Sequence, residues 1–196
     1  LSFSSGTLRT SAAPVIDAIA VDDDYAAVIF CEDHAAQEYI GVFYLAEDGT
    51  VGTAAGGAPA DATRFDIIDQ VDAEALCITK HENSTDLYIG YYNSTIGTKI
   101  SKLEADLTEV YSEKSVLTNG YTVNHITMVP QSDGEVDVYA EINAAETYNH
   151  YIRKSERDSS GDIKPSGGSD WALSVGLIAK AFWLSDTEHY VPVLHE

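Results

Sequence analysis

The chain has 196 residues, and its 11 Lys and Arg against 32 Asp and Glu give a formal net charge of −21. Hydrophobic residues make up 44% of it, which is enough for a packed core and argues against an intrinsically disordered chain. A field of this sign repels polyanions, so we expect no sequence-specific binding of nucleic acid. No run of about 18 apolar residues occurs, so we also expect no membrane span.

Short alternating apolar runs, separated by turn residues, predict an all-β protein. Val, Ile, Tyr and Phe fill these runs, as is typical of strands. The segment Ser101–Ser115 can be read as one acidic helix, but its alternation favours two strands around a turn at Ala105–Thr108. In chain order, the predicted strands are Val15–Val21, Tyr25–Cys31, Glu38–Leu45, Phe65–Val71, Ala75–Lys80, Asp86–Tyr92, Val123–Val129, Val136–Ile142, Asn149–Lys154, Ser174–Trp183 and Tyr190–Leu194.

These strands recur at intervals of about 50 to 58 residues, which indicates an internal repeat. The first strands of successive units align at Val15, Phe65, Val123 and Ser174, and a late hairpin turn aligns at Asp48, Asp106 and Asp158. A four-stranded antiparallel unit of this size is typical of a β-propeller blade. Because blades stack face to face, their inner strands are buried on both sides and should be the most apolar.

We therefore predict one β-propeller-like domain over residues 1–196, with repeats at 15–63, 64–121, 122–170 and 171–196. The count is about 3.5 blades, and the incomplete last unit is completed either by residues 1–14 or by chain beyond Glu196 in a larger propeller. A β-sandwich with a similar number of strands is the structural alternative, and the recurrence disfavours it.

Paired carboxylates on inner strands are the main candidates for enzyme activity, since some propellers cleave glycosides with such acids. Asp17 and Asp66 occupy nearly equivalent positions in two predicted first strands, and Asp69 follows Asp66 closely. However, 32 acidic residues make such a coincidence expected by chance, and the Asp-box motifs of sialidases are missing. We therefore predict no catalytic residue.

Other candidate groups favour structural explanations. Asp22–Asp24 lacks the spacing of a calcium loop and suits a hairpin turn. Cys31 and Cys77 suggest buried free thiols. Tyr88, Tyr91 and Tyr92 form a cluster that suits either an exposed contact surface or ordinary strand packing. The six histidines show no metal-ligand spacing, so no metal site is predicted: His34, His81, His125, His150, His189 and His195.

Two parts of the chain carry a resemblance, namely Ser174–Phe182 with Tyr190–Glu196, and Asp137–Ile142 with Tyr148–Lys154. They resemble propeller-type repeat segments in structural proteins of tailed bacteriophages, such as the nozzle or tube protein at the distal end of a short tail. The resemblance spans about the C-terminal third to half of the chain and implies a β-propeller that assembles as a ring. Those proteins are several times longer, so we expect the sequence to be a fragment. No catalytic residue is carried over from that family.

We therefore expect a non-enzymatic structural module of a bacteriophage tail or another virion component, with no cofactor. The resemblance implies a location in the virion after assembly in the host cytoplasm. Expected partners are copies of the chain in a ring or other virion proteins, and a host-surface glycan is a further candidate. The net charge suggests an acidic channel that repels DNA. The alternatives are a carbohydrate-binding or glycoside-hydrolysing propeller, and a scaffold domain of an extracellular protein from a saline habitat.

Overall fold

The computed structural model describes residues 16–34, 37–52, 66–69, 71–117, 122–144, 149–164, 180–185 and 188–192. Within these ranges the chain forms fourteen strands, all paired antiparallel, and no helix. The prediction of an all-β protein is therefore confirmed. With no helix described, no helix long and apolar enough to cross a membrane is found in these ranges.

The strands form three main sheets and a C-terminal hairpin, each built from strands that follow one another in sequence. The first sheet contains β1 (Ile16–Ala20), β2 (Tyr25–His34), β3 (Gln37–Ala46), β4 (Val51–Gly52) and β5 (Asp66–Asp69). The second contains β6 (Ala75–Thr79), β7 (Leu87–Asn93), β8 (Gly97–Leu103) and β9 (Glu109–Leu117). The third contains β10 (Thr122–Pro130), β11 (Val136–Ala144) and β12 (Asn149–Arg157), and the hairpin pairs β13 (Phe182–Ser185) with β14 (Glu188–Tyr190).

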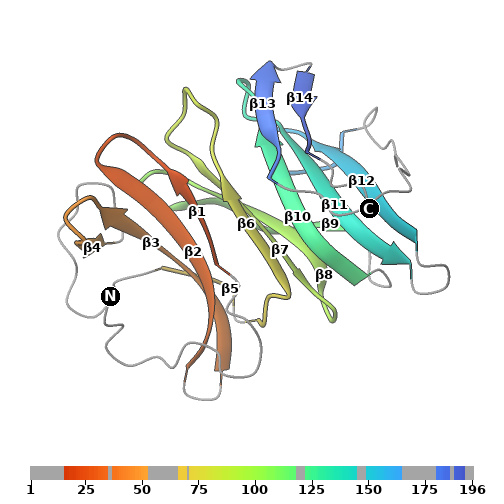
Figure 1. Cartoon of the computed structure of the whole chain (residues 1–196), viewed down its shortest axis with the longest axis horizontal. Helices are drawn as coiled ribbons and strands as arrows, with labels where there is room; N and C mark the ends of the chain where they lie inside the picture. Colours follow the sequence, from red (N-terminus) through yellow and green to blue (C-terminus); the bar gives the residue numbers. More distant parts are fainter. Residues whose placement is uncertain are drawn as a thin grey trace.

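The three sheets stand side by side, with the second sheet between the other two (Figure 1). Strand β6 packs against β1 on one side and against β10 on the other, so the first strand of each sheet lies along one side of the stack. We call β1, β6 and β10 the inner strands. Among the described residues the sheets form an open row, not a closed barrel.

The second sheet is buried on both faces, which explains why its sequence is so apolar. Alternate residues of β6 and β7 point to opposite sides. Leu76 and Ile78 belong to a core shared with the first sheet, whereas Cys77 and Tyr88 belong to a core shared with the third. Every residue of β6 is buried. Such two-sided burial produces a continuous apolar run instead of an alternating one.

Gly90 of β7 lies where the second and third sheets approach each other closely. A Cβ atom at this position would lie 2.9 Å from Ile126 Cδ1, 3.0 Å from Cys77 Sγ and 3.2 Å from Met128 Sδ. Only a glycine allows this packing without a shift of the neighbouring side chains.

The outward faces of the first and third sheets carry different side-chain clusters. On the third sheet, Val129, Tyr139 and Ile152 pack against Ala181, with Trp183 of β13 and Val191 beside them. On the first sheet, four side chains form a separate buried cluster on the face turned away from the second sheet: Val28, Phe30, Tyr39 and Phe43.

The three hairpin turns aligned in the sequence share one backbone geometry, at residues 46–50, 104–108 and 158–162. In each, the N–H of the fourth residue donates to the first carbonyl, at 2.9 Å in all three turns. The first N–H donates to the fifth carbonyl, at 2.8 to 2.9 Å. The middle turn confirms the two-strand prediction for Ser101–Ser115. The fourth residue always has a positive φ: Gly49, Leu107 and Gly161.

One predicted strand belongs to a different sheet than expected. The segment Phe65–Val71 was expected to open the second repeat, but β5 pairs with Ile40–Val42 of β3 at the outer side of the first sheet. That assignment is wrong. The two-residue β4 pairs with only Tyr44 and Leu45, which leaves this part of the β3 edge for β5. The acid-flanked sequence of β5 suits an outer strand, whereas the fully buried β6 suits the inner position.

Candidate functional site

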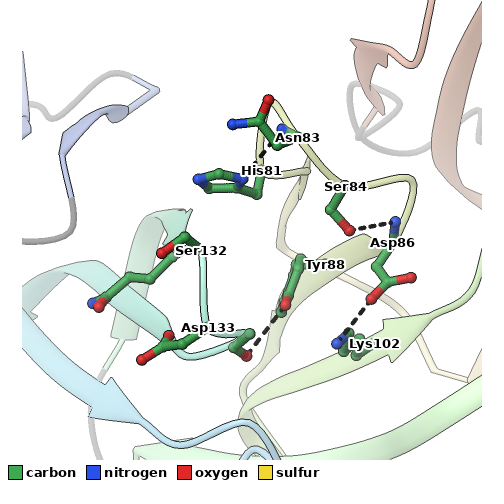
Figure 2. A pocket seen from close by; sticks show the side chains of 10 residues that line it. His81, Asn83, Ser84, Asp86, Tyr88, Lys102, Ser132 and Asp133 are labelled. Atoms are coloured by element: carbon green, nitrogen blue, oxygen red, sulfur yellow. Dashed lines mark hydrogen bonds and ion pairs between the residues drawn. The ribbon is translucent and has the colours of Figure 1, made fainter.

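A polar pocket of about 320 Å³ lies between the loop joining β6 to β7 (residues 80–86) and the loop joining β10 to β11 (residues 131–135). Both loops connect the first strand of a sheet to its second strand, so they meet at the same end of neighbouring sheets. Figure 2 shows the two loops facing each other, with Tyr88 of β7 and Lys102 of β8 between them. The pocket is lined by ten residues: His81, Asn83, Ser84, Asp86, Tyr88, Lys102, Gln131, Ser132, Asp133 and Gly134.

Lys102 lies at the centre of a polar network in this pocket. Its Nζ forms an ion pair with Asp86 Oδ2 at 2.9 Å and lies 5.2 Å from the centre of the Tyr88 ring. The Tyr88 hydroxyl donates to the carbonyl of Gly134 at 3.2 Å, which links the second sheet to the third (Figure 2). The Lys102 side chain is only 11% exposed.

Burial and charge act in opposite directions on Lys102. Burial lowers its pKa, but the hydrogen bond to Asp86 and the nearby Tyr88 raise it, and the net pKa is above the ordinary value. Burial raises the pKa of Tyr88, and the Lys102 charge only partly offsets this effect. The Lys102 ammonium is therefore charged, and the Tyr88 phenol neutral, at physiological pH.

His81 forms one wall of the pocket and is 3% exposed. Its Nδ1 accepts a hydrogen bond from the Asn83 N–H at 3.2 Å, so a neutral ring carries its proton on Nε2. The ring packs edge-to-face on Trp183 of β13, with centroids 4.8 Å apart. His81 Nε2 is buried without a hydrogen-bond partner among the described residues. The histidine thus fixes the loop and joins it to the C-terminal hairpin.

A second polar cluster lies on the inner strands, around Asp17 of β1. Asp17 Oδ2 accepts the N–H of Ile78 in β6 at 2.9 Å, and Lys180 Nζ lies 3.0 Å from the same oxygen. Lys180 Nζ also donates to the Ala18 carbonyl at 3.1 Å. Asp17 therefore ties the first sheet to the second and to the segment before β13.

Next to this cluster, His125 of β10 is the register partner of Glu141 on the adjacent strand β11. Burial lowers the pKa of His125, while the charges of Glu141 and Asp17 work in the opposite direction. Glu141 is fully buried and accepts a hydrogen bond from Asn124 Nδ2 at 3.1 Å.

The carboxylate pair considered for glycoside hydrolysis is not brought together. Asp17, Ile29, Val42 and Asp66 are consecutive register partners across β1, β2, β3 and β5. Three strand spacings separate the two acids, or about 14 Å between backbones. Glycosidases need carboxylates about 5–9.5 Å apart. Asp17 is also occupied by Lys180, and Asp69 accepts the Tyr91 hydroxyl at 2.7 Å.

The remaining candidates have structural roles or lie outside the described residues. Asp22 Oδ1 caps its turn by accepting the N–H groups of Asp24 and Tyr25 at 2.9 and 2.8 Å. The three clustered tyrosines are buried, so the exposed contact surface considered for them is wrong: Tyr88, Tyr91 and Tyr92. Cys31 and Cys77 are buried free thiols, and burial raises the pKa of Cys77 to about 12.

Four histidines remain to be placed. His34 ends β2, His150 lies in β12, and His195 is outside the described residues. His189 of β14 contacts two third-sheet side chains, with Nδ1 3.0 Å from the Tyr139 hydroxyl and 3.2 Å from Asp137 Oδ2.

In the described part of the chain, no cluster of three or more His, Cys, Asp or Glu side chains is arranged to hold a metal ion. No family model and no curated protein sequence matches this chain.

In the sequence, the two pocket loops carry only residue types that are typical of turns, at Asn83–Thr85 and Ser132–Gly134. A usable signal was present nonetheless. Both turns follow the first strand of a sheet, and equivalent loops of stacked sheets lie next to each other. This signal depends on β6 being the first strand of the second sheet. The alignment of the internal repeats instead places Phe65–Val71 in that position.

Proposed function

We propose that the chain is a propeller-type structural module that acts through assembly, with its sheets serving as blades. The observation that carries this proposal is the two-sided burial of the second sheet. Its β6 and β7 side chains pack alternately into the first and third sheets, as blades of a propeller do. A two-sheet sandwich buries one face of each sheet, so it does not account for a middle sheet buried on both faces.

The inner strands support the same proposal. Asp17 joins β1 to β6, and β6 packs against β10 on its other side. First strands of all three sheets therefore meet on one side, where a propeller has its axis. The resemblance to tail proteins of bacteriophages makes a short-tail component our preferred setting, with copies of the chain or other virion proteins as partners.

The acidic channel does not form part of the proposal. On the described inner strands the one carboxylate is Asp17, and Lys180 pairs with it. Many acids instead occupy turns, where their oxygens cap backbone N–H groups, as at Asp48, Asp106 and Asp133. The large negative charge then serves solubility and limits nonspecific association.

The assembly role is tested by measuring the mass of the purified chain by light scattering and imaging it by electron microscopy. We expect ring-shaped oligomers. On the β13–β14 hairpin, Leu184 and Tyr190 are 59% and 58% exposed and alternate with residues that pack on the third sheet. They are the natural contact for a further sheet.

The double variant Leu184→Ser with Tyr190→Ser should therefore dissociate the oligomer. Val110→Ser is the matched control, because Val110 is 46% exposed but lies on β9, away from this hairpin. A chain that stays monomeric at every concentration refutes self-assembly. If Val110→Ser dissociates the oligomer as much as the double variant does, contact through the hairpin is refuted.

A further inference from the structure

We propose that the pocket between residues 80–86 and 131–135 binds one neutral sugar unit of a glycan. This inference goes beyond the assembly role and does not depend on it. The volume of about 320 Å³ lies at the lower end of the range for small-molecule sites and suits a single ring.

The charges of the lining favour a neutral ligand. Two carboxylates, Asp86 and Asp133, and one ammonium, Lys102, line the pocket, and Asp86 and Lys102 neutralise each other. An anionic ligand would meet the remaining carboxylate and the −21 charge of the whole chain. A cationic ligand would be attracted by Asp133, but it would lose its hydration in a confined space that already holds the Lys102 ammonium. A neutral ligand avoids both costs.

The polar groups of the lining match a ligand rich in hydroxyl groups. Gln131 offers a side-chain amide that can donate and accept at once, and Ser84 adds a hydroxyl. Asn83 Nδ2 donates one hydrogen bond to Glu82 Oε1 at 3.2 Å, which leaves its second N–H and its Oδ1 for a ligand. A sugar hydroxyl likewise donates and accepts, so it pairs with such groups in either direction. Asn83 and Gln131 come from opposite loops and can therefore contact both sides of one ring.

The pocket is held in shape before any ligand binds. Ser84 Oγ accepts the N–H of Asp86 at 3.1 Å, and Asp133 Oδ1 accepts the N–H of Glu135 at 3.0 Å. The Tyr88 hydroxyl joins the two sides through the Gly134 carbonyl. A rigid site loses little conformational entropy on binding, which favours a weak but specific ligand such as one sugar.

The experiment is a saturation-transfer NMR screen of the whole chain against glucose, galactose, mannose and N-acetylglucosamine. Glucuronic acid and glucosamine serve as anionic and cationic analogues. We expect at least one neutral sugar to bind, with a Kd on the order of 1 mM, as is reasonable for about 12 heavy atoms. The charged analogues should bind more weakly.

The double variant Asn83→Ala with Gln131→Ala should weaken that binding by at least about tenfold, since each amide hydrogen bond is worth roughly fivefold to tenfold. The matched control is Thr85→Ala with Ser94→Ala, two exposed polar residues outside the pocket, and it should bind like the wild type. Both double variants should unfold at the wild-type temperature.

Three results overturn the proposal. The first is no binding of any neutral sugar up to about 50 mM, well above the expected Kd. The second is preferred binding of a charged analogue. The third is binding that the Asn83 and Gln131 variant leaves unchanged, which would place the sugar elsewhere. None of these results affects the assembly role, which is read from the mass of the particle.

Discussion

Asp17 is the residue whose replacement tests most directly how the sheets are held together. Its Oδ2 accepts a backbone N–H from β6 at 2.9 Å and pairs with Lys180 at 3.0 Å. A hydrogen bond to a charged group contributes about 1.5–3 kcal/mol to stability. The ion pair is about one-quarter exposed, and such pairs add about 0.2–1 kcal/mol.

We therefore expect Asp17→Ala to lower the free energy of unfolding by about 2–3 kcal/mol, from the hydrogen bond and the ion pair together. For a chain of this length the melting temperature should fall by about 4–12 °C. Asp17→Asn retains a neutral acceptor for the Ile78 N–H, so its effect should be about half as large. The assay is urea-induced unfolding followed by circular dichroism.

Asp23→Ala is the control, because Asp23 is exposed in the neighbouring turn, and it should change stability by less than about 0.5 kcal/mol. A double-mutant cycle with Lys180→Met should give a coupling of about 0.5–1 kcal/mol that decreases with added salt. The reasoning is refuted if Asp17→Ala unfolds like Asp23→Ala, or if the coupling is zero.

Three further predictions concern the core and its titrating groups. Gly90→Ala should cost about 1–3 kcal/mol in denaturant unfolding, because its Cβ would lie 2.9 Å from Ile126 Cδ1, and an unchanged midpoint contradicts this packing. Burial lowers the pKa of His125, so the unfolded chain binds its proton more readily and stability should fall as pH drops below about 6.5. His125→Gln should lose less stability than the wild type as the pH drops below about 6.5. Parallel stability profiles of the two proteins would exclude the effect. Burial raises the pKa of Tyr44 to about 12, so stability should be lost as pH rises from about 10 towards that value, and early phenolate absorbance in the folded chain would contradict it.

The fold class and most strands followed from local sequence patterns, because strand alternation and turn residues are properties of neighbouring residues. The turn at 104–108 is an example: Asp106 Oδ1 accepts the Thr108 N–H at 2.9 Å, a contact between residues two apart. The preference for two strands over one helix was therefore correct. The same holds for Asp22, whose capping partners are its near neighbours.

Long-range contacts could not be predicted in the same way. Asp17 and Lys180 are 163 residues apart, and only the stacking of the sheets brings them together. The placement of β5 shows the related problem for strands. Its acidic ends suit an outer strand, but the sheet that it joins depends on the free edge of β3 beside the short β4.

The Asp17 cluster and the pocket between residues 80–86 and 131–135 have different consequences for function. On the inner strands, Asp17 and Lys180 satisfy each other, so changes there should act on stability. In the pocket, Asn83 and Gln131 lie on loops whose backbones are fixed by other residues, so changes there should act on binding and leave the fold intact. Rigid strands that present variable loops are how one scaffold can serve several recognition roles. If the sheet faces serve the proposed assembly and the loop ends the proposed recognition, each should be removable by mutation without the other.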